Sequence, residues 1–348
     1  MTTFAELTTT RVSQAEANLI APETREELID AYLEITSSEA PHLIIAGGSN
    51  TVVADEGFPG TVLAIRTRGI EREKDGDSIL IRAEAGEQWA ALVNQTVNEG
   101  LSGIEALAGI PGSVGAAPVQ NIGAYGQEIA DVLERIELLD AETGEVSRLS
   151  AEELGLGYRT SSLKRGEHRG LVLRVELRLT PVPQGEGAPV KYAQLAKALG
   201  VELGERVDVT AQRDAVLALR ASKGMVLNPD DTDTYSTGSF FMNPIVRHEF
   251  ARDLPADAPR FAAGEDEAGN ELVKLSAAWL IDHAGVHKGF SLPGSGAAIS
   301  SKHTLAITNH QDASATEIAE LARFVVMRVM QEFGVVLRPE ANLIGLEL

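Results

Sequence analysis

The sequence predicts a protein of two or three domains that mixes helices and strands, and three observations support this. At 348 residues, the chain is too long for one ordinary hydrophobic core. Strand and helix signals alternate over residues 18–70 and remain mixed over residues 79–180. A turn-rich stretch, PVPQGEGAP, then interrupts the pattern at Pro181–Pro189.

The first predicted elements surround a glycine turn. Thr24 and Glu27 have capping-box spacing, so a helix should begin just after Pro22. Strands are expected at His42–Ala46, Thr51–Ala54 and Thr61–Ile65. The turn between the first two is Gly47-Gly48-Ser49-Asn50, whose exposed backbone N–H groups suit an anion such as phosphate. An ordinary hairpin turn is the alternative.

The later elements follow the same signals. Further strands are expected at Ser78–Ala83, Val172–Leu179 and Thr237–Asn243, and helices at Glu87–Gly100, Asp208–Ser222 and Lys274–Ala284. A last helix should begin at the capping box Ser314 to Glu317 and stop at Gly334. Its apolar face is formed by Ile318, Leu321, Val325 and Val329.

Composition excludes several functional classes. The formal net charge of −21 argues against non-specific binding to nucleic acid or to an anionic membrane. With no cysteine, the chain has no disulfides, thiolate catalysis or cysteine metal sites. The N-terminus lacks the basic and apolar regions of a signal peptide, and no apolar run is long enough to span a membrane. We therefore expect a cytoplasmic protein without membrane insertion.

The most informative stretch is Gly103–Gly126, GIEALAGIPGSVGAAPVQNIGAYG. It contains six glycines and a single charged residue, Glu105. Loops are usually polar, and buried elements usually avoid glycine. A segment that is both apolar and rich in glycine predicts backbone packed closely against something buried, such as a large ligand.

Common nucleotide and metal motifs are missing. The sequence has neither a P-loop nor a strand-linked G-x-G-x-x-G, so a P-loop nucleotidase and a Rossmann site are not indicated. His283 and His287 are four residues apart, but no H-E-x-x-H accompanies them and Gly285 lies between them. We expect no metal site.

Three polar residues are candidates for chemistry. Arg159, in GYRTSSLK, is suited to bind a carboxylate through two hydrogen bonds, or is a surface arginine in a loop. Ser239, in GSFFMNP, is a possible proton donor in an apolar setting, or belongs to a turn at the end of a strand. Glu340 follows a proline and is either held in place or part of a solvated tail.

Taken together, the motifs resemble the UDP-N-acetylenolpyruvoylglucosamine reductase (MurB) family of flavoenzymes. The matching pieces follow one another in order along nearly the whole chain. They are AGGSNTVVADEGF, GIEALAGIPGSVGAAPVQNIGAYGQEI, GYRTSSLK, RASKGMVLNP, GSFFMNP, LSAAWLID, GAAISSKHTLAITN and RPEANLIG. The long glycine-rich run and GSFFMNP are the most specific.

The resemblance implies an α+β protein with a flavin-binding fold of the vanillyl-alcohol-oxidase (PCMH) type. Two subdomains would bind FAD, residues 1–69 with 334–348 and residues 70–215. The PCMH-type region would cover about 10–182, and residues 216–333 would form an α+β substrate-binding domain.

The resemblance also implies the reaction. NADPH would reduce FAD, and the hydride would then pass to the enolpyruvyl double bond of UDP-N-acetylglucosamine enolpyruvate. The product would be UDP-N-acetylmuramate, a peptidoglycan precursor. Ser239 would be the proton donor, Arg159 would bind the substrate carboxylate, and Glu340 would be the third catalytic residue. We expect a monomer.

Ligand contacts carry over in the same way. The FAD-binding positions would be Gly47, Gly48, Ser49, Asn50, Ile110, Pro111, Gly112, Ser113, Gly115, Gln120, Asn121, Gly123 and Ala124. The substrate-binding positions would be Tyr125, Tyr192, Lys223, Asn243 and His303.

Two departures from the family pattern stand out. The family commonly has Arg-Val-Gly-Gly near the start, and in this chain Ser13 and Gln14 stand in place of the two glycines, after Arg11 and Val12. The family also often has an arginine at the position of Asn342. They leave two alternatives open. One is a flavin oxidoreductase of the same fold with another substrate, and the other is a nucleotide-sugar sensor without catalysis.

Overall fold

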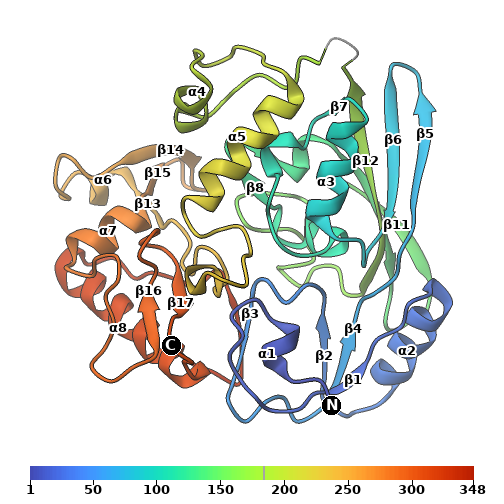
Figure 1. The fold of residues 1–348 in the computed structure, drawn as a ribbon, viewed down its shortest axis with the longest axis horizontal. Coiled ribbons are helices and arrows are strands. Elements are labelled where there is room, and N and C mark those ends of the chain that lie inside the picture. Colours follow the sequence, from blue (N-terminus) through green and yellow to red (C-terminus); the bar gives the residue numbers. More distant parts are fainter. Residues whose placement is uncertain (183–184) are drawn as a thin grey trace. The chain divides into compact units, whose positions relative to one another are not determined.

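The computed structural model describes residues 1–182 and 185–348 (Figure 1). The chain forms two compact units. The first contains Met1–Glu16, Ser49–Phe58 and Leu227–Leu348, and the second contains Ala17–Gly48 and Pro59–Val226. The turn-rich stretch expected at 181–189 falls in the second unit, and its residues 183–184 lie outside the described ranges. The division into three domains stays a prediction.

The second unit contains two sheets with different strand directions. Its helices are α2 (Arg25–Ser37), α3 (Trp89–Asn98), α4 (Ala193–Leu199) and α5 (Val209–Ala221), with short 3-10 helices η1 (Glu105–Leu107), η2 (Val114–Ala116), η3 (Pro118–Gln120) and η4 (Ile129–Asp131). A parallel sheet has the order β1 (Asn18–Ile20), β4 (Thr61–Ala64), β2 (His42–Ile45). An antiparallel sheet has the order β11 (Val146–Ser150), β10 (Leu133–Leu139), β12 (Leu171–Pro181), β6 (Ser78–Glu84), β5 (Ile70–Asp75), and β7 (Leu101–Ser102) pairs with the end of β12. The strands β8 (Gly123–Ala124) and β9 (Gln127–Glu128) form a small ribbon.

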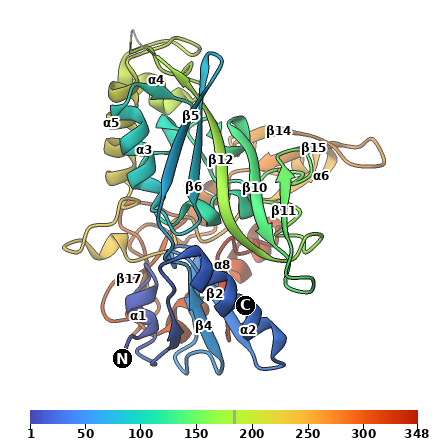
Figure 2. The ribbon, with the colours of Figure 1, turned by 90° about the vertical axis from the view of Figure 1, so that its right-hand side faces the viewer.

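The antiparallel sheet has one apolar and one charged face, because successive side chains of a strand alternate between faces. In β12, Val175, Leu177 and Leu179 are buried in the core of this unit. The helices α3 and α5 lie along that side of the sheet in Figure 2. The residues between them, Glu176 and Arg178, take part in ion pairs.

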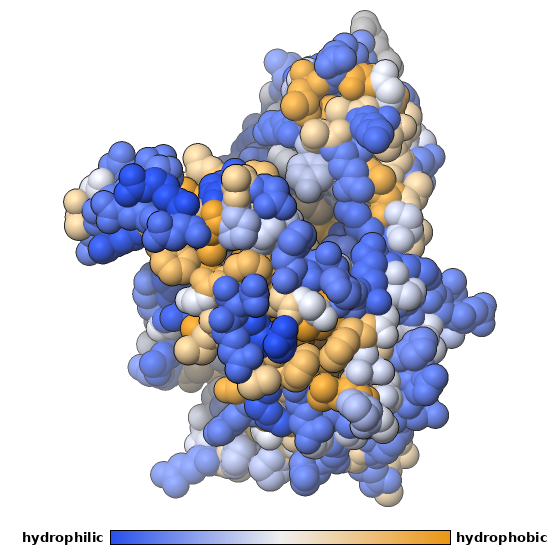
Figure 3. Space-filling model, turned by 90° about the vertical axis from the view of Figure 1, so that its left-hand side faces the viewer, coloured by the Kyte–Doolittle hydropathy of each residue, from blue (hydrophilic) through white to orange (hydrophobic). Residues whose placement is uncertain are grey.

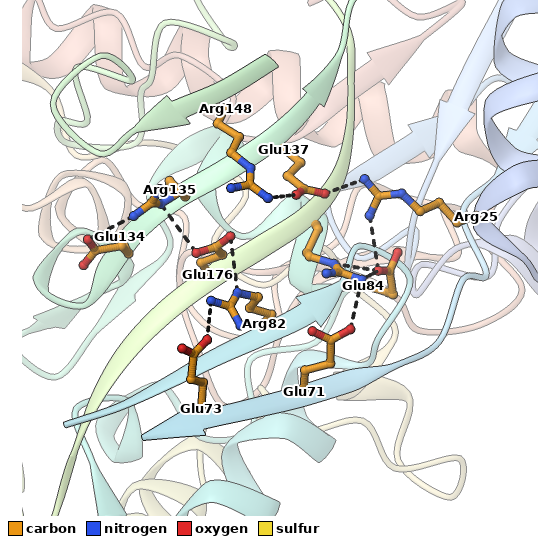
Figure 4. A network of polar contacts seen from close by, with 11 residues as sticks. Arg25, Glu71, Glu73, Arg82, Glu84, Glu134, Arg135, Glu137, Arg148 and Glu176 are labelled. Atoms are coloured by element: carbon orange, nitrogen blue, oxygen red, sulfur yellow. Dashed lines mark hydrogen bonds and ion pairs between the residues drawn. The ribbon is translucent and has the colours of Figure 1, made fainter. Parts of the chain in front are cut away.

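The ion pairs of the charged face join neighbouring strands and one helix (Figure 4). Glu84 on β6 lies opposite Arg174 on β12, and their charged groups are 2.7 Å apart. Arg25, in the first turn of α2, reaches both Glu84 and Glu137. Opposite charges on facing strands stabilise a sheet, and the Arg25 pairs additionally hold α2 against this sheet.

The first unit is built from short elements around a second core. Its helices are α1 (Phe4–Leu7), α6 (His248–Ala251), α7 (Ala277–His283) and α8 (Ala315–Phe333), with the 3-10 helix η5 (Thr232–Thr234). Its strands form an antiparallel sheet β13 (Ile245–Arg247), β15 (Glu271–Leu275), β14 (Arg260–Glu265), an antiparallel pair β16 (Ala297–Ile299) and β17 (Ile307–Asn309), and a parallel pair β18 (Asn342–Ile344) and β3 (Thr51–Val53). The buried face of α8 packs into this core.

The helix signals of the sequence are confirmed at both ends of the chain. Thr24 caps α2, and its capping box with Glu27 is present. Ser314 caps α8 in the same way, and Gly334 ends that helix in the left-handed conformation. The carboxylate of Asp55 also accepts hydrogen bonds from the N–H groups of the first turn of α8, at 2.7 and 3.0 Å. Short polar caps therefore define where these helices begin.

Two expected elements differ in the structure. No strand forms over Thr237–Asn243, because within this segment only Phe241 makes a bridge, with Pro339, and its neighbours do not continue the pairing as a ladder. The helix expected from Lys274 begins at Ala277, because Lys274 and Leu275 extend β15 and Ser276 caps the helix.

One face of the surface is predominantly polar. On the face drawn in Figure 3, hydrophilic residues surround smaller apolar patches. Over residues 1–182 and 185–348, no helix combines the length and apolar character needed to cross a bilayer.

The ion pairs of the charged face make stability depend on pH. Burial alone would raise the pKa of Glu137, but hydrogen bonds and charge from Arg25 outweigh it, so this pKa lies below its usual value. A lowered folded-state pKa stabilises the protein above the unfolded-state pKa, and this contribution is lost as pH falls through the folded-state value. We expect Glu137→Gln to lower the free energy of unfolding at neutral pH by about 1–3 kcal/mol.

Urea denaturation at decreasing pH measures this effect. The difference between Glu137→Gln and the wild type should shrink as Glu137 becomes protonated in the wild type. Glu34→Gln, at an exposed position of α2, is the control and should change little at any pH. A Glu137→Gln deficit that stays constant down to acidic pH would contradict the role assigned to the charge.

Candidate functional site

The glycine turn after β2 packs against the long glycine-rich run. A Cβ at Gly47 would lie 2.7 Å from the Cα of Gly112, closer than real Cβ contacts. The next residue, Gly48, has φ +59°. The hairpin alternative is wrong, because β2 pairs with β4 whereas β3 pairs with β18. The two glycine-containing loops thus meet backbone to backbone.

Hydrogen bonds fix the run to the end of β6 and the start of α3. The N–H of Gly115 donates to Ala85 O at 2.9 Å, and a Cβ on Gly115 would lie 2.4 Å from that of Ala85. The N–H of Val114 donates to Glu87 O at 2.8 Å, and that of Trp89 to Gly112 O at 3.1 Å. Gly112 has φ +121°. Ile110 and Pro111 directly precede this contact and belong to no regular element.

A polar group in this cradle lacks a partner. Ser113 is 6% exposed, and its hydroxyl has no hydrogen-bond partner among the described residues. Buried polar groups are normally paired. An unpaired hydroxyl beside closely packed glycine backbone is the arrangement expected where a phosphate-bearing cofactor binds. The residues present therefore fit the flavin dinucleotide that the sequence predicts.

The end of the run is held by Asn121 and Arg159. Asn121 has the left-handed φ of +47°, and its side-chain amide donates to Glu128 at 2.8 Å and to Gly157 O at 3.1 Å. Arg159, with φ +53°, donates to the carbonyls of Asn121 at 3.3 Å and Gly123 at 2.9 Å. Strained backbone of this kind often marks functional sites.

The remaining predicted flavin positions belong to different elements and have contacts of their own. Gln120 ends η3 and accepts a hydrogen bond from Lys164 Nζ at 3.3 Å. Gly123 and Ala124 form β8. Ser49 and Asn50 belong to the first unit, where Asn50 donates to Glu340 O at 3.1 Å.

Two tyrosines and two cations gather in the second unit. The rings of Tyr125 and Tyr192 meet edge to face with centroids 5.6 Å apart, and Lys223 Nζ lies 5.4 Å from the Tyr125 ring. Burial is the main reason why the pKa of Tyr125 lies above its usual value. The structure adds Arg220 to this group. The positive charge of Arg220 favours the ionised form of Tyr125, and the charge of Arg159 lowers the pKa of Arg220.

Arg220 was absent from the sequence prediction. Burial lowers its pKa to about 10, which leaves it protonated at neutral pH, and its Nε has no partner among the described residues. The signal that identifies it is its place in the last turn of α5, just before the turn that carries Lys223.

Ser239 and Glu340 are brought together within the first unit. The N–H of Glu340 donates to Phe240 O at 2.8 Å, and that of Met242 donates to Arg338 O at 3.0 Å. On its other side, Phe240 N donates to Leu305 O at 2.7 Å. The GSFFMNP segment therefore lies between the loop that carries His303 and the segment that carries Glu340.

The same segment fixes Asn243. Its side-chain oxygen accepts a hydrogen bond from the N–H of Ala277 at 2.9 Å, at the first residue of α7. Phe240 and Phe241 are both buried and meet with centroids 5.0 Å apart. The two aromatic residues anchor the segment in the core, while Ser239 is only half-buried.

The two histidines with metal-like spacing have other contacts. His283 stacks on Trp279 with centroids 3.8 Å apart, and His287 pairs with Asp282 at 3.1 Å. Within the described ranges, no group of three potential ligands is placed to hold a metal ion.

The departure at Ser13 has a structural counterpart. Ser13 is buried with φ +64°, a conformation in which glycine is favoured, and its hydroxyl donates to Ala54 O at 2.7 Å. Asn342 begins β18 and donates through its backbone to Asn50 O at 2.9 Å, so backbone pairing holds the terminal segment.

Comparison with known protein families matches both parts of the chain. Residues 17–150 match a family described as an FAD binding domain. Residues 230–344 match the C-terminal domain of UDP-N-acetylenolpyruvoylglucosamine reductase.

Similar proteins span the full length. The UDP-N-acetylenolpyruvoylglucosamine reductase of Leifsonia xyli is 55% identical, and the match covers 99% of this chain and 98% of that protein. The reductase of Saccharopolyspora erythraea is 48% identical, over 99% and 95% of the two chains. The crystal structure of the reductase from Thermus caldophilus superposes with a TM-score of 0.65 at 30% identity, over 99% and 97%. The α+β class and the FAD-binding fold predicted from the sequence are confirmed.

The contact between the two glycine loops leads to a test. Gly47→Ala would place a methyl group against the backbone of Gly112, and backbone cannot move aside as a flexible side chain can. We expect the variant to retain FAD at least tenfold more weakly, as measured by flavin fluorescence on dilution. About 1.4 kcal/mol of lost binding energy accounts for that factor.

Gly166→Ala is the matched control. Gly166 also has a positive φ, +75°, but lies at an exposed turn with open space around its Cβ position. It should lose some stability through its backbone conformation while its FAD affinity remains that of the wild type. Equal flavin loss in both variants would show that the Gly47 contact has no specific part in binding.

Proposed function

The chain belongs to the UDP-N-acetylenolpyruvoylglucosamine reductase family and is an FAD-dependent oxidoreductase, and on this premise we propose its reaction. It uses NADPH to reduce UDP-N-acetylglucosamine enolpyruvate to UDP-N-acetylmuramate, a precursor of peptidoglycan. The observation that carries the proposal is the backbone pairing that joins the Ser239 and Glu340 segments.

FAD, when bound, supplies the chemistry that carries a hydride from the nicotinamide to the enolpyruvyl double bond. The cradle formed by Gly47, Gly112 and Gly115 would hold it by close backbone approach, and Ser113 would donate a hydrogen bond from its hydroxyl.

Ser239 would supply the proton that the reduction requires. Hydride addition to the terminal carbon of the double bond leaves negative charge on the carbon beside the substrate carboxylate. That carbon must then gain a proton. A serine hydroxyl is a poor acid in water, so its half-buried position between Gly238 and the buried Phe240 supports this role.

Arg159 would stabilise the negative charge that develops during the reaction. Its guanidinium is already oriented by the carbonyls of Asn121 and Gly123, and a preoriented cation loses little energy on reorganisation. Glu340, whose backbone is fixed at both N–H and carbonyl, would complete the electrostatic arrangement.

Local positive charge supports binding of a nucleotide diphosphate by an acidic protein. Lys223 donates to Gln194 at 2.7 Å beside the Tyr125 ring. Together with Arg220, it forms a cationic region in a chain of net charge −21. Cations held by neighbouring groups are pre-organised for phosphate.

Anaerobic stopped-flow measurement of flavin absorbance tests the proposed function. NADPH should bleach the flavin, and UDP-N-acetylglucosamine enolpyruvate should restore its absorbance. If only oxygen restores it, the chain is a flavin oxidase with another substrate. If NADPH fails to bleach a fully loaded protein, the proposed donor is wrong.

Removing the proposed proton donor should separate the two half-reactions. Ser239→Ala should still be reduced by NADPH, whereas reoxidation by the nucleotide sugar should slow by roughly two or more orders of magnitude. Ser222→Ala, at an exposed position after α5, should leave both rates unchanged. Normal reoxidation of Ser239→Ala would contradict the role assigned to Ser239.

Arginine should be required at position 159 because of its planar shape. Arg159→Lys keeps the charge but cannot contact two carbonyls and a carboxylate at once. We expect KM for the nucleotide sugar to rise at least tenfold, while the flavin content stays unchanged. Arg148→Lys, on an exposed arginine of β11, is the control. An unchanged KM in the Arg159→Lys enzyme would remove the carboxylate contact from the proposal.

A further inference from the structure

The loop between β16 and β17 carries His303, and its conformation depends on one carboxylate. Asp233 is 8% exposed and accepts hydrogen bonds from the N–H of Ser301 at 2.8 Å and from its hydroxyl at 2.6 Å. Ser300 also helps to lower the pKa of this carboxyl. Asp233 belongs to η5, six residues before Ser239, so the contact joins the loop to the segment that leads into the proposed site.

Ser300 passes this constraint on to His303. Ser300 is fully buried, and its hydroxyl oxygen accepts from the N–H of Lys302 at 3.0 Å and of His303 at 3.2 Å. The carbonyl of His303 in turn accepts from Ala306 N at 3.1 Å. The backbone of His303 is therefore held at both its N–H and its carbonyl.

Charge supports the same arrangement. Burial opposes ionisation of Asp233, but hydrogen bonds from Ser301 and Ser300 outweigh it, so the pKa of this carboxyl lies below its usual value. Lys302 adds a positive charge, with Nζ 3.8 Å from Asp233 and in direct contact with Asp231.

The ring of His303 shows which nitrogen carries the proton. The backbone N–H of Leu305 points at His303 Nδ1, with 3.2 Å between the two nitrogens. A backbone N–H can only donate, so Nδ1 must be the acceptor. In the neutral ring, the proton is therefore on Nε2, which becomes a hydrogen-bond donor.

We propose that Asp233 is a positioning residue: it holds the loop in which the N–H of Leu305 fixes His303 as the Nε2–H tautomer, so that His303 donates a hydrogen bond to an anionic oxygen of the substrate. The residue that sets the tautomer, Leu305, also accepts from the N–H of Phe240 at 2.7 Å, directly after Ser239. Through Leu305, the His303 side chain is thereby linked to the segment that carries Ser239. The substrate part of this inference depends on the proposed function, whereas the tautomer does not.

The tautomer can be measured without activity. Long-range nitrogen–proton correlation spectra of the FAD-loaded protein, labelled at its seven histidines, report which ring nitrogen is protonated, and His303→Gln assigns the signal. The expected result is a proton on Nε2. A proton on Nδ1 would overturn the proposal.

Two substitutions at His303 test the donor. The side-chain nitrogen of glutamine can replace an Nε2–H donor, whereas leucine cannot donate. We expect His303→Leu to raise KM for the nucleotide sugar roughly tenfold or more, the loss expected for one hydrogen bond to a charged group, and His303→Gln to restore most of it. If His303→Gln raises KM as much as His303→Leu does, His303 does not act as a hydrogen-bond donor.

Binding of UDP distinguishes the two possible anionic oxygens. UDP contains the diphosphate but not the enolpyruvyl carboxylate. If His303→Leu weakens UDP binding as much as substrate binding, the donor contacts the diphosphate, and if UDP binding is unchanged, it contacts the carboxylate. A His303→Leu enzyme that binds both ligands normally would contradict the proposal.

Asp233→Asn tests the positioning role. It should allow both tautomers and raise KM several-fold, while flavin content remains that of the wild type. Asp266→Asn is the matched control, because Asp266 also accepts several hydrogen bonds within its own turn, at the β14–β15 connection. An Asp233→Asn protein with the wild-type tautomer and KM would overturn the proposal. If the wild type does not reduce the nucleotide sugar at all, the proposed function fails and the spectra still decide the tautomer.

Discussion

The proposed site of the first unit depends on backbone hydrogen bonds made by one short segment. Phe240 and Met242 donate to Leu305 and Arg338, and Phe240 accepts from Glu340. These bonds join parts of the chain that are far apart in sequence. They place the segment that carries Ser239 beside the segment that carries Glu340. The buried aromatic pair after Ser239 holds this segment in the core, so packing and hydrogen bonding define the same position.

The second unit uses charge in two different ways. On the antiparallel sheet, Arg25 and its partners neutralise buried glutamates, and these contacts are made within the protein. Near Tyr125, Arg220 is a buried cation whose Nε finds no partner in the part of the chain that the structure describes. A paired network stabilises structure, whereas a cation with spare hydrogen-bonding capacity is available to an anionic ligand. The overall acidity of the chain therefore says little about what its site binds.

Local signals predicted the regular elements well and the irregular ones poorly. The capping boxes at Thr24 and Ser314 mark where α2 and α8 begin, because a cap is decided by residues three apart. The strand expected over Thr237–Asn243 was wrong because only Phe241 forms a bridge there, and whether such a bridge continues as a ladder depends on a partner segment that local signals do not show. Arg220 was missed because an arginine near the end of an amphipathic helix looks like an ordinary surface residue in the sequence. Only the tertiary structure shows that its side chain is buried.

The sequence by itself determined the family, the FAD-binding fold and the glycine-rich run, because these depend on residue identities in order along the chain. It also showed that Gly47 and Gly112 lie in loops of unusual composition. Only the tertiary structure decided that the two glycines touch, that the Ser113 hydroxyl is unpaired within the described residues, and that Asp233 holds the loop of His303. Such facts depend on distances between residues remote in sequence, and no local pattern encodes a distance.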